Sequence, residues 1–192
     1  MKKYLDVKQL EIDKLLEEGF VKLSPIDKAF NLEIFTKKIL SEMKNLTFST
    51  SCKSHEELLN KLKIKEHLSP ILYKFAKKYF SYKGNIENQY HVVRMVRPGD
   101  IIEQYRAHFD SHIFTLVLPI KIPVSKSKER GELILYPNAR RYPKFELENI
   151  LGKIFFKKYA NKNSISKLIE KKYARVENFD DMRPILFNGV TT

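Results

Sequence analysis

The sequence predicts an α+β fold, with helices in the first half of the chain and short strands in the second. Up to about residue 87, apolar side chains recur three and four residues apart, as in amphipathic helices. From Asn88 the pattern changes to short runs rich in Val, Ile and Tyr, which are typical of strands. The length of 192 residues and the 43% hydrophobic content suffice for one folded domain. We therefore expect a single domain over 1–192, with helical support in 1–87 and a β core in 88–192.

Local start and stop signals mark the elements of the first half. Gly19 can end the first helix, Ser54 and Glu57 form a capping box for the third, and Ser69-Pro70 opens the fourth. The expected elements are helices over 7–18, 27–43, 54–62 and from 69 to the Gly84-Asn85 pair, and a strand over 20–23.

The second half reads as strands interrupted by one helix. Strands are expected near 88–96, 101–107, 113–122, 132–136, 172–178 and 184–190, and an exposed loop over 126–130. The helix is expected over 144–162. Its apolar positions, predicted to face the core, are Leu147, Ile150, Leu151, Ile154, Phe155 and Tyr159.

The formal net charge of +13 raises the question of a nucleic-acid or membrane-surface partner. The lysines are spread over nearly every expected helix, where they would form solvated faces, and lysine far outnumbers arginine. A nucleic-acid partner is therefore possible in principle but not favoured. We prefer the interpretation that the positive charge reflects a compositional bias of the source.

Compartment signals favour the cytoplasm. No apolar stretch is long enough to span a membrane, and charges follow Met1 before any secretion signal could form. The single Cys52 cannot form an internal disulfide, which agrees with a reducing compartment.

Three residues able to bind a metal alternate along one short segment: His108, Asp110 and His112. In an extended chain, residues two apart face the same way and lie roughly 6.6 Å apart, and residues four apart lie roughly 13 Å apart. Because metal bonds are only about 2 Å long, one neighbouring pair can share an ion, whereas His108 and His112 cannot. His108 with Asp110 is one such pair, and Asp110 with His112 is the alternative.

The surrounding segment resembles the double-stranded β-helix (jelly-roll, cupin-like) core of the iron(II)- and 2-oxoglutarate-dependent dioxygenases. In that family a Tyr-Arg-x-His-x-Asp-Ser-type strand end precedes an apolar strand, and a Gly-x-Leu strand follows. The matching residues here are Tyr105, Arg106, His108, Asp110 and Ser111, then 115–118, then 131–133.

The resemblance implies roles for four residues. His108 and Asp110 would be two of the three protein ligands of iron(II), in a facial triad of two histidines and one carboxylate. Tyr105 would donate a hydrogen bond to 2-oxoglutarate, and His112 would line the substrate entrance. Packing in the core is the alternative for Tyr105, and packing beside the site is the alternative for His112.

Two parts of the family pattern find no match in this chain. The second histidine ligand usually follows a Leu-Phe-x-Gly-like segment, which 184–192 resembles, and an arginine that binds 2-oxoglutarate comes later. Since no histidine occurs after His112, we expect both residues beyond Thr192. A metal-deficient relative is the other interpretation. His91 and Lys121 are weak substitutes, expected to pack in a sheet and to reach solvent, respectively.

The leading hypothesis is an oxygenase that uses O2, iron(II) and 2-oxoglutarate to hydroxylate a small substrate of anionic or sugar-like character. One alternative is a non-catalytic basic binding module on a degenerate β-helix scaffold. Another is a cupin-like metalloenzyme that is not an oxygenase.

Overall fold

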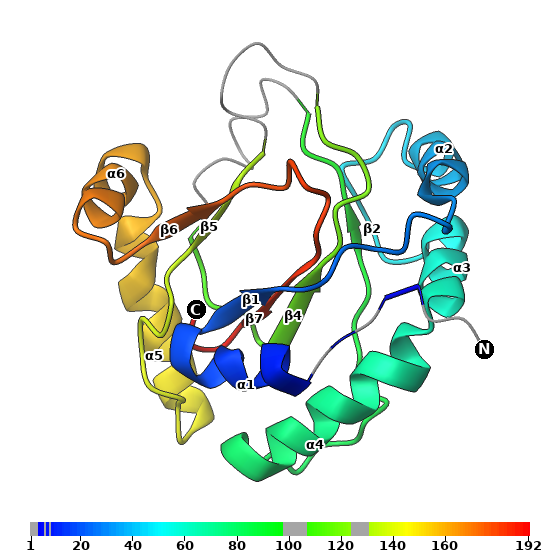
Figure 1. The fold of residues 1–192 in the computed structure, drawn as a ribbon. Helices are drawn as coiled ribbons and strands as arrows, with labels where there is room; N and C mark the ends of the chain where they lie inside the picture. Colours follow the sequence, from blue (N-terminus) through cyan, green and yellow to red (C-terminus); the bar gives the residue numbers. More distant parts are fainter. Residues whose placement is uncertain (1–3, 6, 8, 98–106, 124–130) are drawn as a thin grey trace. The chain divides into compact units, whose positions relative to one another are not determined.

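The computed structural model describes residues 4–5, 7, 9–97, 107–123 and 131–192, and within them it shows a mixed α+β chain with six α-helices and small antiparallel sheets (Figure 1). The chain divides into two compact units. The helical unit comprises 1–7 and 24–99, and the sheet unit comprises 8–23 and 100–192. The sheet unit carries the candidate site.

The helical unit is built from amphipathic helices that share an apolar interior. It contains α2 (Leu32–Glu42), α3 (Lys53–Leu62), a π-helical turn (Ile64–Leu68), α4 (Ser69–Phe80), and the antiparallel strands β2 (Phe48–Ser49) and β3 (Val93–Arg94). Among the apolar positions of these helices, Ile34 and Tyr79 are exposed, and the buried ones are Phe35, Ile39, Leu58, Leu59, Leu62, Phe75 and Ala76.

The cap of α3 comes from the preceding helix rather than from a capping box. Ser54 lies inside α3, so the prediction that it caps this helix is wrong. The carboxylate of Glu42 instead accepts hydrogen bonds from the backbone N–H of Lys53 at 2.9 Å and of Ser54 at 3.1 Å, and from the Ser54 hydroxyl. The Ser54 hydrogen bond is the main reason why the pKa of Glu42 lies below its ordinary value. Glu42 thus accepts hydrogen bonds from backbone N–H groups in the first turn of α3, which have no partner within the helix.

Three other boundaries in the helical unit differ from prediction. The second helix begins at Leu32, capped by Asn31, because Asp27 instead accepts a hydrogen bond from the backbone of Ala29 in a turn. The fourth helix ends at Phe80 before the expected Gly84-Asn85 stop, with Ser81 in the left-handed conformation. The strand expected over 88–96 is reduced to β3, and β2 was not predicted.

The sheet unit is organised around one fully buried strand. Its main sheet has the order β1-β7-β4, all antiparallel, with β1 (Phe20–Lys22), β7 (Ile185–Asn188) and β4 (Phe114–Val117). Every residue of β7 is buried, as expected for a central strand covered on both faces. The helix α1 (Gln9–Glu18) leads into β1 through Gly19. The core cluster around this sheet consists of Phe20, Leu135, Phe179, Ile185 and Phe187.

A second, two-stranded sheet and two helices complete the unit. They are β5 (Leu133–Leu135), which pairs with β6 (Arg175–Glu177), α5 (Glu146–Phe156), a 3-10 turn (Lys157–Tyr159) and α6 (Lys162–Glu170). The strands β4 to β7 lie within the predicted ranges. The single helix predicted over 144–162 is too long, because it ends at Phe156, and Asn161 caps the unpredicted α6.

The predicted inward face of α5 is wrong in the described structure. Phe156 faces the interior, with its ring 4.6 Å from that of Phe109 and 4.9 Å from that of Tyr136. The residues predicted to be buried are instead exposed by 45 to 66% at Leu147, Ile150, Leu151 and Ile154, and by 67% at Phe155.

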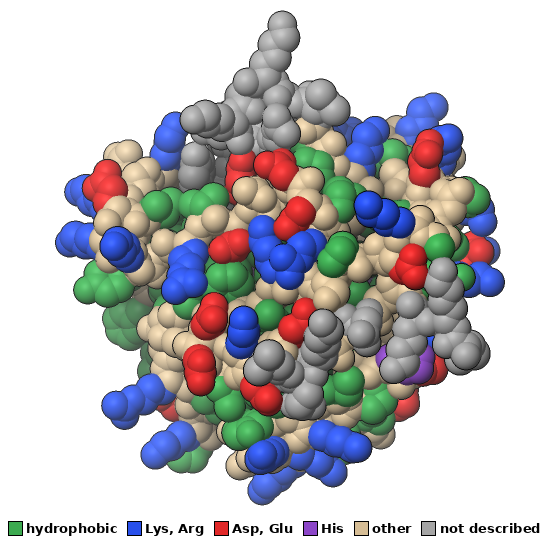
Figure 2. Space-filling view, viewed as in Figure 1, with side chains coloured by type: hydrophobic (Ala, Val, Ile, Leu, Met, Phe, Trp, Pro, Cys, Tyr) green, Lys and Arg blue, Asp and Glu red, His purple; other side chains and the backbone are tan. Residues whose placement is uncertain are grey.

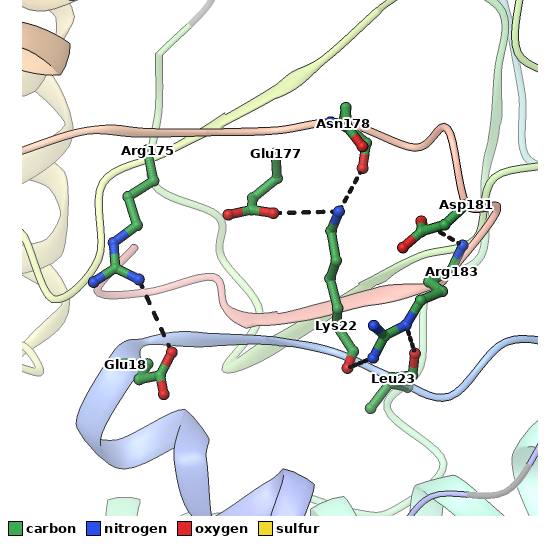
Figure 3. Close-up of polar contacts among 8 residues, drawn as sticks. All are labelled: Glu18, Lys22, Leu23, Arg175, Glu177, Asn178, Asp181 and Arg183. Carbon is green, nitrogen blue, oxygen red and sulfur yellow. Dashed lines mark hydrogen bonds and ion pairs between the residues drawn. The ribbon is translucent and has the colours of Figure 1, made fainter.

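Polar side chains tie β1 to the chain that leads into β7 (Figure 3). The Arg183 guanidinium donates to the backbone oxygens of Lys22 at 2.8 Å and Leu23 at 2.7 Å. The ammonium of Lys22 donates in turn to the Asn178 carbonyl at 2.8 Å and lies 3.4 Å from a Glu177 carboxylate oxygen. These contacts fix the pairing of β1 with β7, and β7 positions the candidate site.

Candidate metal centre

The segment with the His-x-Asp pair is a loop fastened to the end of β7. Residues 107–110 have no regular structure, and 111–113 form a bend that leads into β4. The backbone N–H of Asp110 donates to the Gly189 carbonyl at 2.7 Å, and the N–H of Gly189 donates to the Ile113 carbonyl at 3.0 Å. The residue that follows β7 therefore sets the position of the loop.

Gly189 can make these two bonds because it has no side chain. A Cβ there would lie 2.7 Å from both the Cβ of Asp110 and the carbonyl oxygen of His112, and 2.9 Å from the Thr115 hydroxyl. Distances this short are not tolerated, and two of the three atoms belong to backbone or to a Cβ that cannot rotate away. The close approach of the two segments requires glycine at this position.

The structure brings His108 and Asp110 together. Nε2 of His108 lies 3.3 Å from Oδ1 of Asp110. The histidine side chain is 58% exposed and the carboxylate 23%. Two atoms that bind one metal ion at adjacent positions, each about 2.1 Å from the ion, lie roughly 3.0 Å from each other. The donor pair therefore fits two neighbouring positions on one metal ion.

Thr115 holds the other carboxylate oxygen. Its hydroxyl donates to Oδ2 of Asp110 at 2.5 Å, which leaves Oδ1 directed at His108. Burial raises the pKa of Asp110, but the hydrogen bonds from His108 and Thr115 and the nearby charges of His108 and His112 lower it by more. The net result is a pKa below the ordinary 3.8, so the carboxylate is ionised at neutral pH and available as a ligand.

The other two predicted site residues have different outcomes. The common orientation of His108, Asp110 and His112 was predicted for an extended chain, whereas the structure has a bend over 111–113. His112 is exposed at this bend, directly after the pair. Tyr105, predicted to contact 2-oxoglutarate, lies outside the described residues.

A third metal ligand is not found in the part of the chain that the structure describes, where no three His, Cys, Asp or Glu side chains could hold one ion together. His55 and His91 belong to the helical unit, where their rings lie 6.4 Å apart, edge to face. Burial is the main reason why the pKa of each lies below the ordinary 6.5. Lys121, the other weak substitute, is exposed as predicted.

Sequence reasoning missed two residues that support the loop. Arg140 is half-buried, and its guanidinium stacks 3.9 Å above the Phe109 ring. The same guanidinium donates to the Val190 carbonyl at 2.7 Å and to Oδ1 of Asn149 at 2.6 Å, so it joins the loop, the end of β7 and α5. Lys153 of α5 donates to the Ser111 hydroxyl at 2.8 Å. Such long-range partners leave no signal in local spacing.

Comparisons with protein-family models, with curated proteins and with solved structures gave no match. None of the helices in the described residues is long and apolar enough to cross a membrane.

Proposed function

We propose that this chain forms the metal-binding part of an iron(II)- and 2-oxoglutarate-dependent oxygenase on a double-stranded β-helix scaffold. The observation that carries the proposal is the 3.3 Å approach of Nε2 of His108 and Oδ1 of Asp110 at a solvent-accessible loop beside a buried strand. A histidine and a carboxylate on neighbouring positions are two of the three ligands of a facial triad.

Each residue of the site has a definite part in this proposal. His108 and Asp110 bind iron(II) through the two atoms that converge, and Thr115 orients the carboxylate by its hydrogen bond to Oδ2. Gly189 allows β7 to hold the loop at the distance that the pair requires. Iron, when bound, would supply the site at which O2 oxidises 2-oxoglutarate to succinate and carbon dioxide, while the protein orients the reactants.

The proposed roles of Tyr105 and His112 complete the site. Tyr105 would donate a hydrogen bond to 2-oxoglutarate. His112, exposed next to the pair, would line the entrance for a small anionic or sugar-like substrate. The reaction would take place in the cytoplasm, in line with the single cysteine.

The proposal is tested by succinate formation from 2-oxoglutarate in the iron-loaded protein, expressed as the full natural reading frame. We expect succinate to form only when oxygen is present, and to fall to background in His108→Ala and Asp110→Ala. His67→Ala, a histidine of the helical unit, is the matched control and should retain turnover. Absence of oxygen-dependent succinate in a protein that binds iron would contradict the oxygenase and favour a cupin-like metalloenzyme.

The alternative of a basic nucleic-acid-binding module receives less support from the charge distribution. Figure 2 shows Lys and Arg side chains interleaved with Asp and Glu on the face that it presents, rather than a stripe of one sign. Phosphate backbones favour clustered cations. Salt-sensitive nucleic-acid binding by a protein that takes up no iron would nevertheless replace the oxygenase proposal with this one.

A further inference from the structure

The surface of α5 carries an apolar stripe that the described residues leave uncovered. Its members follow the spacing i, i+3, i+4, i+7 and i+8, which places them along one face of a helix. On the side of α5 in Figure 2, apolar side chains reach the surface of the sheet unit. The stripe consists of Leu147, Ile150, Leu151, Ile154 and Phe155, each 45 to 67% exposed, and Phe145 before it is 73% exposed.

The stripe is unusual because the opposite face of the same helix already packs against the rest of the sheet unit. Phe156 packs against Phe109, Asn149 accepts a hydrogen bond from Arg140, and Lys153 donates to Ser111. These contacts fix the rotation of α5 about its axis. The apolar face therefore cannot turn inward without breaking the contacts that support the candidate metal centre.

Basic residues border the stripe. Residues 140–158 contain six Lys or Arg and two Glu. Lys157 and Lys158 follow Ile154 by three and four residues, so they come next along the same face, and both are exposed. At the other end, Arg141 and Lys144 are exposed as well. The local charge is thus complementary to an anionic surface.

A groove opens beside the stripe and continues its apolar character. It has a volume of about 570 Å³, and its lining includes Arg141, Phe145, Leu147, Glu148 and Leu151. The Glu148 carboxylate accepts a hydrogen bond from the backbone N–H of Lys144 at 2.7 Å. An apolar groove with an exposed arginine at its rim suits an acyl chain and the anionic headgroup attached to it.

We infer that α5 is a membrane-docking helix, which lies flat on an anionic lipid surface with its stripe in the headgroup and acyl boundary. Protruding Leu, Ile and Phe side chains together with flanking lysines are the composition of interfacial helices. A second copy of the chain fits less well, because pairing two stripes would bring Arg141, Lys157 and Lys158 of both copies to one rim. The inference is independent of the proposed function, since it uses no metal ligand.

The test is co-sedimentation with vesicles of phosphatidylcholine alone and with about 30% phosphatidylserine. We expect binding to the anionic vesicles that falls between about 0.05 and 0.5 M salt, and little binding to the neutral ones. Ile154→Gln should weaken binding at least about tenfold, because one anchoring side chain is lost. Lys157→Gln with Lys158→Gln should weaken it about 25-fold, at roughly fivefold per lysine.

Matched variants in the helical unit control for general loss of apolar or basic residues. Ile34→Gln, which changes an isoleucine that is 51% exposed, and the pair Lys77→Gln and Lys78→Gln should bind vesicles like the unchanged protein. Circular dichroism confirms that each variant is folded. The inference is overturned if the unchanged protein binds neither kind of vesicle, or if Ile154→Gln binds as well as Ile34→Gln. It is also overturned if light scattering shows a dimer that Ile154→Gln dissociates while no vesicles bind.

Discussion

Each unit contains a histidine beside another ionisable side chain, and the surroundings of the two pairs differ. In the sheet unit, His108 is 58% exposed and lies 3.3 Å from a carboxylate. In the helical unit, His91 lies edge to face with His55, and its Nε2 is buried with no hydrogen-bond partner among the described residues. The pair in the sheet unit includes the carboxylate itself and an exposed ring, whereas both rings of the helical pair are only partly exposed and burial outweighs the nearby charge of Glu56.

The comparison shows why residue type alone does not identify a metal site. In the helical pair, burial disfavours the protonated form of both rings. In the sheet unit, the carboxylate stays ionised because His108 and Thr115 hydrogen-bond to it. Three substitutions and a pH series test this distinction.

The largest effect is expected for Gly189→Ala. The added methyl group would meet Asp110 and the His112 backbone at 2.7 Å, so β7 and the loop must separate. We expect the free energy of unfolding to fall by about 1–3 kcal/mol in chemical denaturation. Metal binding by the His108 and Asp110 pair should be lost at the same time.

Gly84→Ala provides the control for Gly189→Ala. A Cβ at Gly84 meets only the outer part of the Tyr82 side chain, which can rotate away. Its stability should change little. If Gly189→Ala is as stable as Gly84→Ala and keeps its metal affinity, the close approach of β7 does not define the site.

A smaller effect is expected for Thr115→Val, which removes the hydroxyl bound to Oδ2 of Asp110. Loss of a partner that orients a ligand typically weakens metal affinity about 10- to 100-fold, and we expect the lower end. Thr115→Ser keeps the hydroxyl and should restore the affinity measured by calorimetry. Equal affinities for the Val and Ser variants would show that this hydrogen bond does not orient the carboxylate.

The smallest effect is the pH dependence of the helical pair. The pKa of His91 is lowered by burial and by the charge of Lys65, and the pKa of His55 by burial and by His91, with Glu56 opposing both. The unfolded chain therefore binds more protons below the ordinary pKa of 6.5. The free energy of unfolding is therefore highest above that pH. It decreases as the pH falls through the lower pKa values of the two histidines in the folded protein.

Thermal unfolding between about pH 8 and 5 checks this sign. The melting temperature should decrease toward acid, and His91→Phe should make the decrease shallower because one of the two titrating rings is gone. His67→Phe, outside the pair, should keep the slope of the unchanged protein. If His91→Phe does not change the slope of melting temperature against pH, the histidine pair is not its cause.

The fold class and several strands were predictable because they depend on local pattern. The apolar runs that form β4 and β7, and the end of α1 at Gly19, are visible in the sequence. The proximity of His108 and Asp110 was predicted as well, although the loop that produces it is bent rather than extended.

Features that depend on tertiary contacts could not be predicted. Periodicity identified the apolar face of α5 but not that Phe156 and Arg140 would turn that face outward. The cap of α3 comes from Glu42, eleven residues before Lys53. The need for glycine at position 189 appears only once Asp110 and His112 lie against it.

An anaerobic iron(II) titration followed by calorimetry decides whether His108 and Asp110 bind one metal ion. The protein should bind a single iron(II) ion. The variants His108→Ala and Asp110→Ala should each remain folded but lose saturable binding. His55→Ala and His91→Ala, from the histidine pair of the helical unit, should leave iron binding unchanged. Saturable binding that survives in both His108→Ala and Asp110→Ala, or that disappears in His91→Ala, would contradict the account.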